Sequence, residues 1–348
     1  MATSNKLKAW VRYDGQKKIV PSSLILQAHK PKVGTWEEVP TDLCCQPTPN
    51  ALRLFFVDLE EVNTAVGDIT NVNDWNDFFD LPAFGNPFKS VEIFGNEVRL
   101  FGGSNITLQY GLFGYTSLRL NIFKVIDDAG CVISIEDAAF DSCDTLREVY
   151  FPEVTETTYD DSYGAFGYCS FLKTAYLPKL RQLGTSGPFY GCIGLKNLTL
   201  AFDEITQLGN DVFDSCYELT SLSFPNLLTT GSNTFGSCIN LTSLNLPSLQ
   251  AAGDYTFGNV YSLTQIILPS LVYIGNLGMY GCTSLTTISL PSCTNLGGSV
   301  GNNNVFQGIT GNIITLTVPA ALMTCNAGQP DGDIQYLQAN NTVTVITV

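Results

Sequence analysis

Cysteine is the residue type in this sequence with the most obvious capacity for chemistry. The 348-residue chain has 11 cysteines and a single histidine, His29. A zinc site needs ligands that converge, as paired C-x-x-C segments do, and a thiol nucleophile needs a base such as histidine. Here six cysteines recur one per copy at the same position of a repeat, with parallel side-chain directions. We therefore interpret them as small buried apolar residues and expect neither metal nor disulfides.

Carboxylates are the second group that could do chemistry. They are frequent between Asp127 and Asp161, and a pair of them could serve as the acid and base of a glycan hydrolase. Most fall at expected turns, where a solvated role is the default, and no phosphate-binding loop or dinucleotide fingerprint is present. We predict that the protein is not an enzyme and uses no cofactor; a glycan-active enzyme is the distant alternative.

The cysteines belong to a unit of roughly 22 residues that recurs from about residue 135 to 319, with the skeleton L-x-x-L-x-L-P-x-L-x-x-I-G-x-x-x-F-x-x-C. One copy cannot bury its own leucines, so stacked coils must form ladders of like side chains, with a parallel sheet along one face. Glycine after isoleucine permits a tight corner with positive φ. The predicted repeat core includes Phe140, Cys143, Phe166, Cys169, Phe189, Cys192, Phe213, Cys216, Phe235, Cys238 and Cys282.

This skeleton resembles the BspA-like subclass of leucine-rich repeats over about eight copies. Val260 replaces cysteine in one copy and Met279 replaces phenylalanine in another, and both keep the apolar volume. The resemblance implies an α/β-type repeat solenoid, mostly β, with a parallel sheet on one face; the strand-like runs of residues 1–45 predict a small β domain before it. It also implies adhesion or protein interaction at a microbial surface.

Changes of pattern divide the chain into five parts. We predict a small β docking domain (1–45) with a hairpin at Asp14-Gly15, a linker (46–50), an N-terminal cap with degenerate coils (51–112), the solenoid (113–319) and a C-terminal cap (320–348). In the caps we expect a strand over 51–59, a helix after Thr70, a helix over 331–340 and a strand from Thr342.

Charge is spread unevenly over the chain. The net charge is −15, residues 1–50 carry seven basic and four acidic side chains, and no Lys or Arg follows Lys196. An acidic body argues against a nucleic-acid partner, and no apolar run is long enough to insert into a membrane. The neutral late coils favour packing against other copies or other proteins, so we expect a homo-oligomer.

The outward strand positions form the candidate binding face. They carry charge and tyrosine in the early coils and Ser, Thr and Asn later, and Tyr150 and Tyr176 should lie in one column. These residues either recognise a host-surface protein or glycan, or merely suit exposed strands. The candidate face comprises Arg147, Glu148, Tyr150, Lys173, Tyr176, Lys196 and Asn197.

The N-terminal segment resembles those of structural proteins from tailed bacteriophages. Together with the lack of a signal peptide, this resemblance favours a virion component, made in the host cytoplasm, that docks to other virion proteins through residues 1–45 and displays the solenoid as a fibre or decoration. The alternative is a cellular surface adhesin. The candidate docking residues are Lys6, Lys8, Trp10, Arg12, Lys17, Lys18, Lys30, Lys32 and Trp36.

Overall fold

The computed structural model describes residues 51–79, 88–116, 118, 121–157, 164–184, 187–297, 304–326 and 328–348, together with the backbone of three short N-terminal strands. These strands are β1 (Lys8–Arg12), β2 (Ile25–Gln27) and β3 (Trp36–Val39), and they form an antiparallel sheet in the order β2-β1-β3. The expected small β unit is therefore present. The Asp14-Gly15 turn lies outside the described residues.

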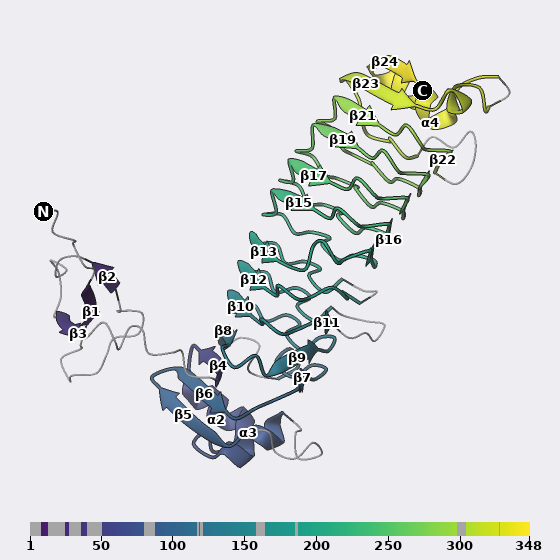
Figure 1. Ribbon diagram of the computed structural model, residues 1–348. Helices are drawn as coiled ribbons and strands as arrows, with labels where there is room; N and C mark the ends of the chain where they lie inside the picture. Colours follow the sequence, from purple (N-terminus) through teal and green to yellow (C-terminus); the bar gives the residue numbers. More distant parts are fainter. Residues whose placement is uncertain are drawn as a thin grey trace, which may run out of the picture.

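An antiparallel sheet and two helices close the N-terminal end of the solenoid (Figure 1). The antiparallel part of the sheet contains β4 (Ala51–Phe56), β5 (Ser90–Phe94) and β6 (Glu97–Phe101). It is continuous with the sheet of the solenoid, because β4 also pairs with β8, the first coil strand. The strand predicted over 51–59 ends at Phe56, since Asp58 caps helix α2 (Leu59–Val66) by accepting a hydrogen bond from the N–H of Glu60. The sequence analysis missed this helix.

The predicted second helix is confirmed as α3 (Val72–Phe78), capped by Asn71. Its Trp75 is fully buried, and the rings of Phe78 and Phe79 lie 5.9 and 6.2 Å from that of Phe113. Phe113 in turn stacks on Phe140, the first phenylalanine of the predicted repeat core, at 5.0 Å. The helix therefore covers the open end of the aromatic ladder, which would otherwise face water.

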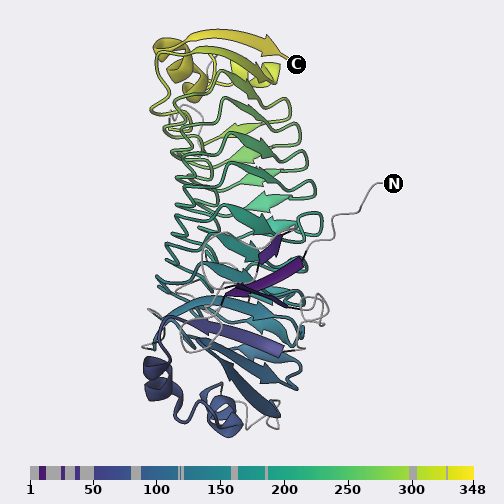
Figure 2. The same cartoon turned by 90° about the vertical axis from the view of Figure 1, so that its left-hand side faces the viewer.

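The predicted parallel sheet runs along one face of the solenoid and is seen face-on in Figure 2. Its strands are β8 (Ile122–Asp127), β10 (Glu148–Tyr150), β12 (Thr174–Tyr176), β13 (Asn197–Thr199), β15 (Ser221–Ser223), β17 (Ser243–Asn245), β19 (Gln265–Ile267), β21 (Thr287–Ser289), β23 (Ile313–Val318) and β24 (Thr342–Thr347). The ladder is interrupted twice, because among these strands no pairing joins β13 to β15 or β17 to β19.

A second ladder of short parallel strands, which the sequence analysis did not predict, follows the corner after the proline. It consists of β7 (Ile106–Leu108), β9 (Val132–Ile135), β11 (Glu156–Thr157), β14 (Gln207–Leu208), β16 (Thr229–Thr230), β18 (Ala251–Ala252), β20 (Tyr273–Ile274) and β22 (Asn295–Leu296). Each of the two-residue strands buries its second residue, such as Leu208 or Ile274, on the inner side. The core therefore lies between two sheets and a third, turn-rich wall that carries the phenylalanines and cysteines.

The third wall contains a stack of aromatic rings and, at a fixed position of successive coils, a residue with positive φ. From Phe113 to Phe257 the rings stack at 5.0–6.0 Å with interplanar angles of 2–13°. The residue two positions after the phenylalanine has positive φ in successive coils, and it is glycine, serine, asparagine or, once, tyrosine. These residues are Ser142, Tyr168, Gly191, Ser215, Ser237, Asn259, Gly281 and Gly308.

The corner glycines correct one expectation. Gly184 has φ of +64°, as predicted, but Gly231, Gly253 and Gly275 do not have positive φ. A Cβ on Gly253 would instead lie 2.5 Å from the carbonyl carbon and oxygen of Gly231 in the preceding coil. Close approach of neighbouring backbones, and not backbone conformation, therefore selects glycine in these later coils.

We expect Gly253→Ala to destabilise the protein by roughly 3 kcal/mol, at the upper end of ordinary overpacking costs, because the crowded atoms are backbone on a rigid ladder. Urea unfolding followed by circular dichroism measures this free energy. The half-exposed turn change Ser262→Ala should stay within about 0.5 kcal/mol of the parent. Equal stability of Gly253→Ala and the parent would contradict the crowding that the structure shows.

The C-terminal segment completes the last coil. It contains the 3-10 helix η3 (Ala320–Met323), helix α4 (Gly332–Asn340) and β24, which pairs with β23 in parallel. Helix α4, predicted over 331–340, is confirmed, and its cap residue Asp331 accepts a hydrogen bond from the N–H of Asp333 at 3.0 Å. None of the helices in the described ranges is long and apolar enough to span a membrane.

Candidate functional site

The early coils bring the candidate face residues together on the outside of the first ladder. Strands β10, β12 and β13 are in register, with Glu148 beside Thr174 and Tyr150 beside Tyr176, and Thr174 beside Asn197. The rings of Tyr150 and Tyr176 are 6.1 Å apart, as the repeat spacing predicted. Arg147, Lys173, Tyr176, Lys196 and Asn197 are exposed, whereas Glu148 and Tyr150 are half-buried.

Charged side chains pack against the aromatic rings of this face. Lys124 on β8 forms a 2.5 Å ion pair with Glu148, and its Nζ lies 5.3 Å from the centre of the Tyr150 ring. The guanidinium of Arg147 lies 5.9 Å from the centre of the Phe171 ring. Phe171 is 53% exposed although it precedes a buried leucine. The sequence analysis missed both Phe171 and Lys124. For Phe171 the sequence did contain a signal, because an aromatic residue there stands next to a core leucine; for Lys124 it contained none.

A pair of tyrosines marks the neighbouring corner of the same coils. The rings of Tyr168 and Tyr190 meet edge to face at 4.9 Å, and Tyr168 is 44% exposed. The hydrogen bond that Tyr190 donates to Tyr168 raises the pKa of Tyr190 to about 12, and partial burial and the nearby Asp214 act in the same direction. Tyr190 therefore stays neutral at physiological pH, and the exposed ring of Tyr168 beside it offers an amphipathic surface for contact.

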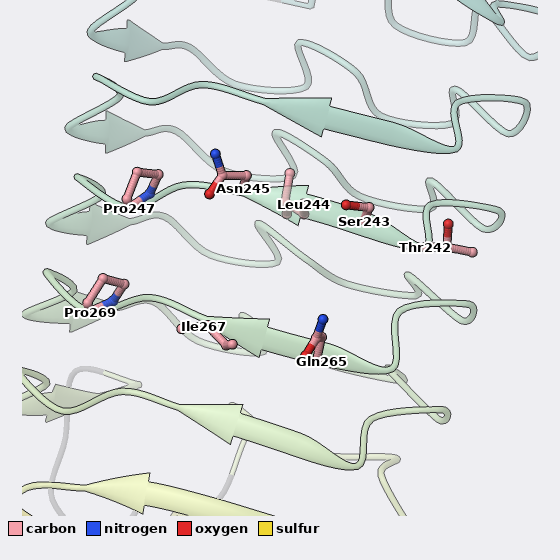
Figure 3. Close-up of a pocket in the computed structure, with 8 residues that line it drawn as sticks. All are labelled: Thr242, Ser243, Leu244, Asn245, Pro247, Gln265, Ile267 and Pro269. Carbon is pink, nitrogen blue, oxygen red and sulfur yellow. The ribbon is translucent and has the colours of Figure 1, made fainter.

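Two hollows lie in the later part of the sheet face, one at each interruption of the ladder. The larger, of about 550 Å³, lies between β13 and β15 and includes Lys196, Asn197 and Phe202. The smaller, of about 330 Å³, lies between β17 and β19 and includes Asn245 and Gln265 (Figure 3). Two of the predicted face residues therefore line the larger hollow, together with Thr199, the strand neighbour of Tyr176.

The predicted repeat core is buried, and the structure adds a role for its cysteines. All nine cysteines of the described residues are free, and eight of them are buried. In five coils the thiol donates to the carbonyl oxygen of the phenylalanine in the preceding coil, for example Cys192 Sγ to Phe166 O at 3.1 Å. These thiols therefore link adjacent coils by weak hydrogen bonds as well as filling space.

Burial also makes the ladder thiols unreactive. It raises the pKa of Cys282 to about 12 and that of Cys192 well above the usual thiol range. Since the thiolate is the reactive form, iodoacetamide on the native protein should modify the exposed Cys325 and leave Cys192 and Cys282 unlabelled. Mass spectrometry of chymotryptic peptides measures this, with urea-unfolded protein as the control. Equal labelling of Cys192 and Cys325 in native protein would contradict the packing shown here.

Two of the early carboxylates hold the backbone or an arginine in place. Asp127 accepts hydrogen bonds from the backbone N–H groups of Cys131 and Val132 at 3.0 and 2.8 Å and so closes the turn between β8 and β9, and burial raises its pKa. Asp128 binds Arg53 at 3.1 Å. Within the described ranges, no group of three or more His, Cys, Asp or Glu side chains could hold a metal ion. His29 lies outside those ranges.

The docking residues are described only in part. Lys8, Trp10 and Arg12 lie on β1 and Trp36 on β3, and the backbone register places Arg12 opposite Trp36 and Trp10 opposite Glu38. The other five predicted docking residues, Lys6, Lys17, Lys18, Lys30 and Lys32, lie outside the described residues.

Comparison with known proteins identifies the family to which the repeat region is similar. The family model described as BspA type Leucine rich repeat region matches residues 113–230 and 206–327 in six copies, which is more than half of the chain. No curated protein matches the chain.

Similar solved structures include a leucine rich cell surface protein from Faecalibacterium prausnitzii A2-165, with 21% identity, 54% of this chain and 59% of that chain covered and a TM-score of 0.41. A leucine-rich repeat protein from Bacteroides ovatus ATCC 8483 has 18% identity, coverage of 74% and 90% and a TM-score of 0.30. The T. pallidum leucine rich repeat protein has 17% identity, coverage of 60% and 77% and a TM-score of 0.25. This chain thus spans 59% of the first of these proteins. At these TM-scores the structures add no argument to the family match.

Proposed function

Because the chain belongs to the BspA-type leucine-rich repeat family, we propose that it is a non-enzymatic binding protein whose early-coil sheet face recognises a partner. One observation carries the proposal: exposed aromatic rings and cations gather on one continuous part of the ladder, where Arg147 covers Phe171 and Tyr150 stands beside Tyr176. Aromatic residues and arginine are the side chains that most often dominate binding energy at protein interfaces.

The test uses fluorescently labelled full-length protein and whole bacteria from a panel of species. We expect saturable binding to at least one species, and a loss of affinity of about tenfold or more for the double variant Lys173→Ala/Tyr176→Ala, since each removed side chain is exposed on the face. Tyr261→Ala is the matched control, because Tyr261 is 45% exposed in a late coil and Tyr176 is 40% exposed. Saturable binding that both variants retain would show that the early-coil face is not the site.

We further propose that the protein is a virion component that docks through residues 1–45 and displays the solenoid as a fibre or decoration. The resemblance of the N-terminal segment to tailed-bacteriophage structural proteins supports this, as does the excess of basic residues there against an acidic body. A segment with an excess of basic residues attracts an acidic partner. The alternative is a cellular surface protein of the same repeat family.

Mass spectrometry of purified particles separates these two locations. The virion proposal predicts the chain in particles, and a strong loss of incorporation for the full-length variant Lys8→Glu/Arg12→Glu, whereas Arg181→Glu on the solenoid should incorporate normally. Detection in the cell envelope and absence from particles would establish the cellular alternative instead.

A further inference from the structure

The coil that precedes the interruption between β13 and β15 differs in sequence from its neighbours. The coil from Cys192 to Cys216 is 24 residues long, against 22 in the next coils, and lacks the proline that follows the strand elsewhere. Residues 201–204 form a turn in which the N–H of Glu204 donates to the carbonyl of Ala201. The turn begins after Leu200, at the position where the neighbouring coils have proline, and no pairing joins β13 to β15.

The interruption leaves backbone groups of the sheet without strand partners. The N–H of Asn197 donates to Lys173 O in the coil before β13, and Thr220 O accepts from the N–H groups of Thr242 and Ser243 in the coil after β15. These groups therefore bond to the strands on the sides away from the gap. Alternate residues of a strand in a parallel ladder bond to opposite sides, so the N–H and C=O groups of Leu198, Ser221 and Ser223 face the gap. No backbone hydrogen bond crosses it between the described residues 196–200 and 219–224.

Side chains give the gap a mixed polar and apolar lining. Leu198 is half-buried, whereas its counterparts Val149 and Ala175 in the continuous part of the sheet are fully buried. The half-buried ring of Phe202 is held edge-on by Phe224 at 5.1 Å, so it forms a fixed aromatic wall. Ser221 and Ser223 are exposed along the other wall. The hollow volume of about 550 Å³ lies in the range of small-ligand sites.

We propose that this hollow binds a neutral sugar unit of a glycan. Sugar hydroxyls both donate and accept, which matches paired N–H and C=O groups and serine hydroxyls, and the C–H face of a pyranose matches the Phe202 ring. A peptide strand fits less well, because adding a strand needs an open sheet edge and here β15 stands on the far side. Lys196 is the one charged side chain among the lining residues, and on the adjoining turn, which carries Asp203 and Glu204, Glu204 pairs with Arg181. The charges around the hollow are therefore balanced and do not favour an anionic sugar.

This inference deepens the proposed function, since it names the ligand class for the end of the binding face that holds Lys196 and Asn197. The same architecture recurs between β17 and β19, where Leu244 is half-buried and a second hollow of about 330 Å³ includes Asn245 and Gln265. Figure 3 shows these side chains on the two neighbouring strands that no pairing joins. The larger hollow alone has an aromatic wall among its lining residues, so it is the site proposed.

The experiment is binding of labelled full-length protein to an array of immobilised neutral, sialylated and sulfated glycans. We expect binding to neutral glycans, and a loss of at least tenfold for Ser223→Trp, which fills the hollow. Ser289→Trp is the matched control at the same repeat position over the continuous ladder β19-β21-β23 and should bind normally. Phe202→Leu keeps an apolar contact with Phe224 but removes the aromatic face, and should weaken binding even where Ser223→Trp misfolds.

Binding to anionic glycans alone, binding to no glycan, or equal binding by Ser223→Trp and the parent would each overturn the proposal. The whole-cell assay keeps this failure apart from that of the general function. If the protein binds no glycan on the array but still binds cells through Lys173 and Tyr176, the proposed early-coil binding face is supported and the proposed sugar site is wrong.

Discussion

Replacing Phe189 by alanine should lower the free energy of unfolding by about 3–5 kcal/mol, the range for large aromatic truncations in cores. Phe189 is fully buried in the middle of the ring ladder and stacks on Phe166 at 5.5 Å and on Phe213 at 5.8 Å. Its removal would leave a cavity that cannot collapse, because the rungs on both sides are fixed by the backbone spacing of the two sheets. Stability in such arrays depends on contacts between adjacent coils, so both neighbouring interfaces are weakened at once.

Urea unfolding of the full-length protein, followed by circular dichroism, measures this change. Phe171→Ala is a suitable control, because it removes the same ring from a neighbouring coil at a site that is 53% exposed. The control should lose about 1 kcal/mol or less, mainly the contact with Arg147. Equal losses for the two variants would mean that the ladder does not carry the stability assigned to it.

The C-terminal coil should become more stable as the pH falls from 8 to 5. Asp333 is fully buried; its Oδ1 accepts from the N–H of Val305 at 2.6 Å, whereas its Oδ2 accepts no hydrogen bond within the described structure. Desolvation, and to a smaller extent the neighbouring Asp331, raise the pKa of Asp333 to about 7. In the unfolded chain an aspartate titrates near ~3.9.

The sign follows from these two values. Between pH ~4 and pH 7 the folded form holds a proton that the unfolded form has lost, so stability falls as the pH rises, by up to about 1.4 kcal/mol per unit. Above pH 7 this contribution levels off. From pH 8 to pH 5 the protein should therefore gain on the order of 2–3 kcal/mol from this one group.

Comparison with Asp333→Asn isolates the effect. The amide oxygen can still accept from Val305, and the side chain no longer ionises, so the variant should be more stable than the parent at pH 8 and show a flatter pH profile. Asp203→Asn, at an exposed position, should keep the parent profile. Burial also raises the pKa of Asp214, to about 6, so a residual slope is expected in both variants. If the free energy of unfolding of Asp333→Asn and of the parent changed equally with pH, Asp333 would not be the cause of the pH dependence.

The repeat made most of the solenoid predictable. Leucines, phenylalanines and cysteines at fixed spacing can be buried only by stacking, and the parallel first ladder, the buried cysteines and the Tyr150–Tyr176 neighbours follow from that requirement. The caps were predictable where local signals are strong, as at Asn71 before α3 and Asp331 before α4. Helix α2 was missed because its eight residues follow directly on a strand-like run, although Asp58 and Glu61 have the spacing of a capping box.

The sequence by itself determined which side chains of each coil are buried, since each coil must bury the same positions as its neighbours. What only the tertiary structure decided is how successive coils meet. The second ladder, the thiol bonds to phenylalanine carbonyls and the crowding at Gly253 are contacts between backbones that lie about one repeat apart. Such contacts depend on the distance between coils, which side-chain periodicity does not encode. For the same reason the sequence analysis gave no role to the greater length of the coil from Cys192 to Cys216, which is two residues longer than the next coils and in the structure contributes Lys196 and Phe202 to the larger hollow.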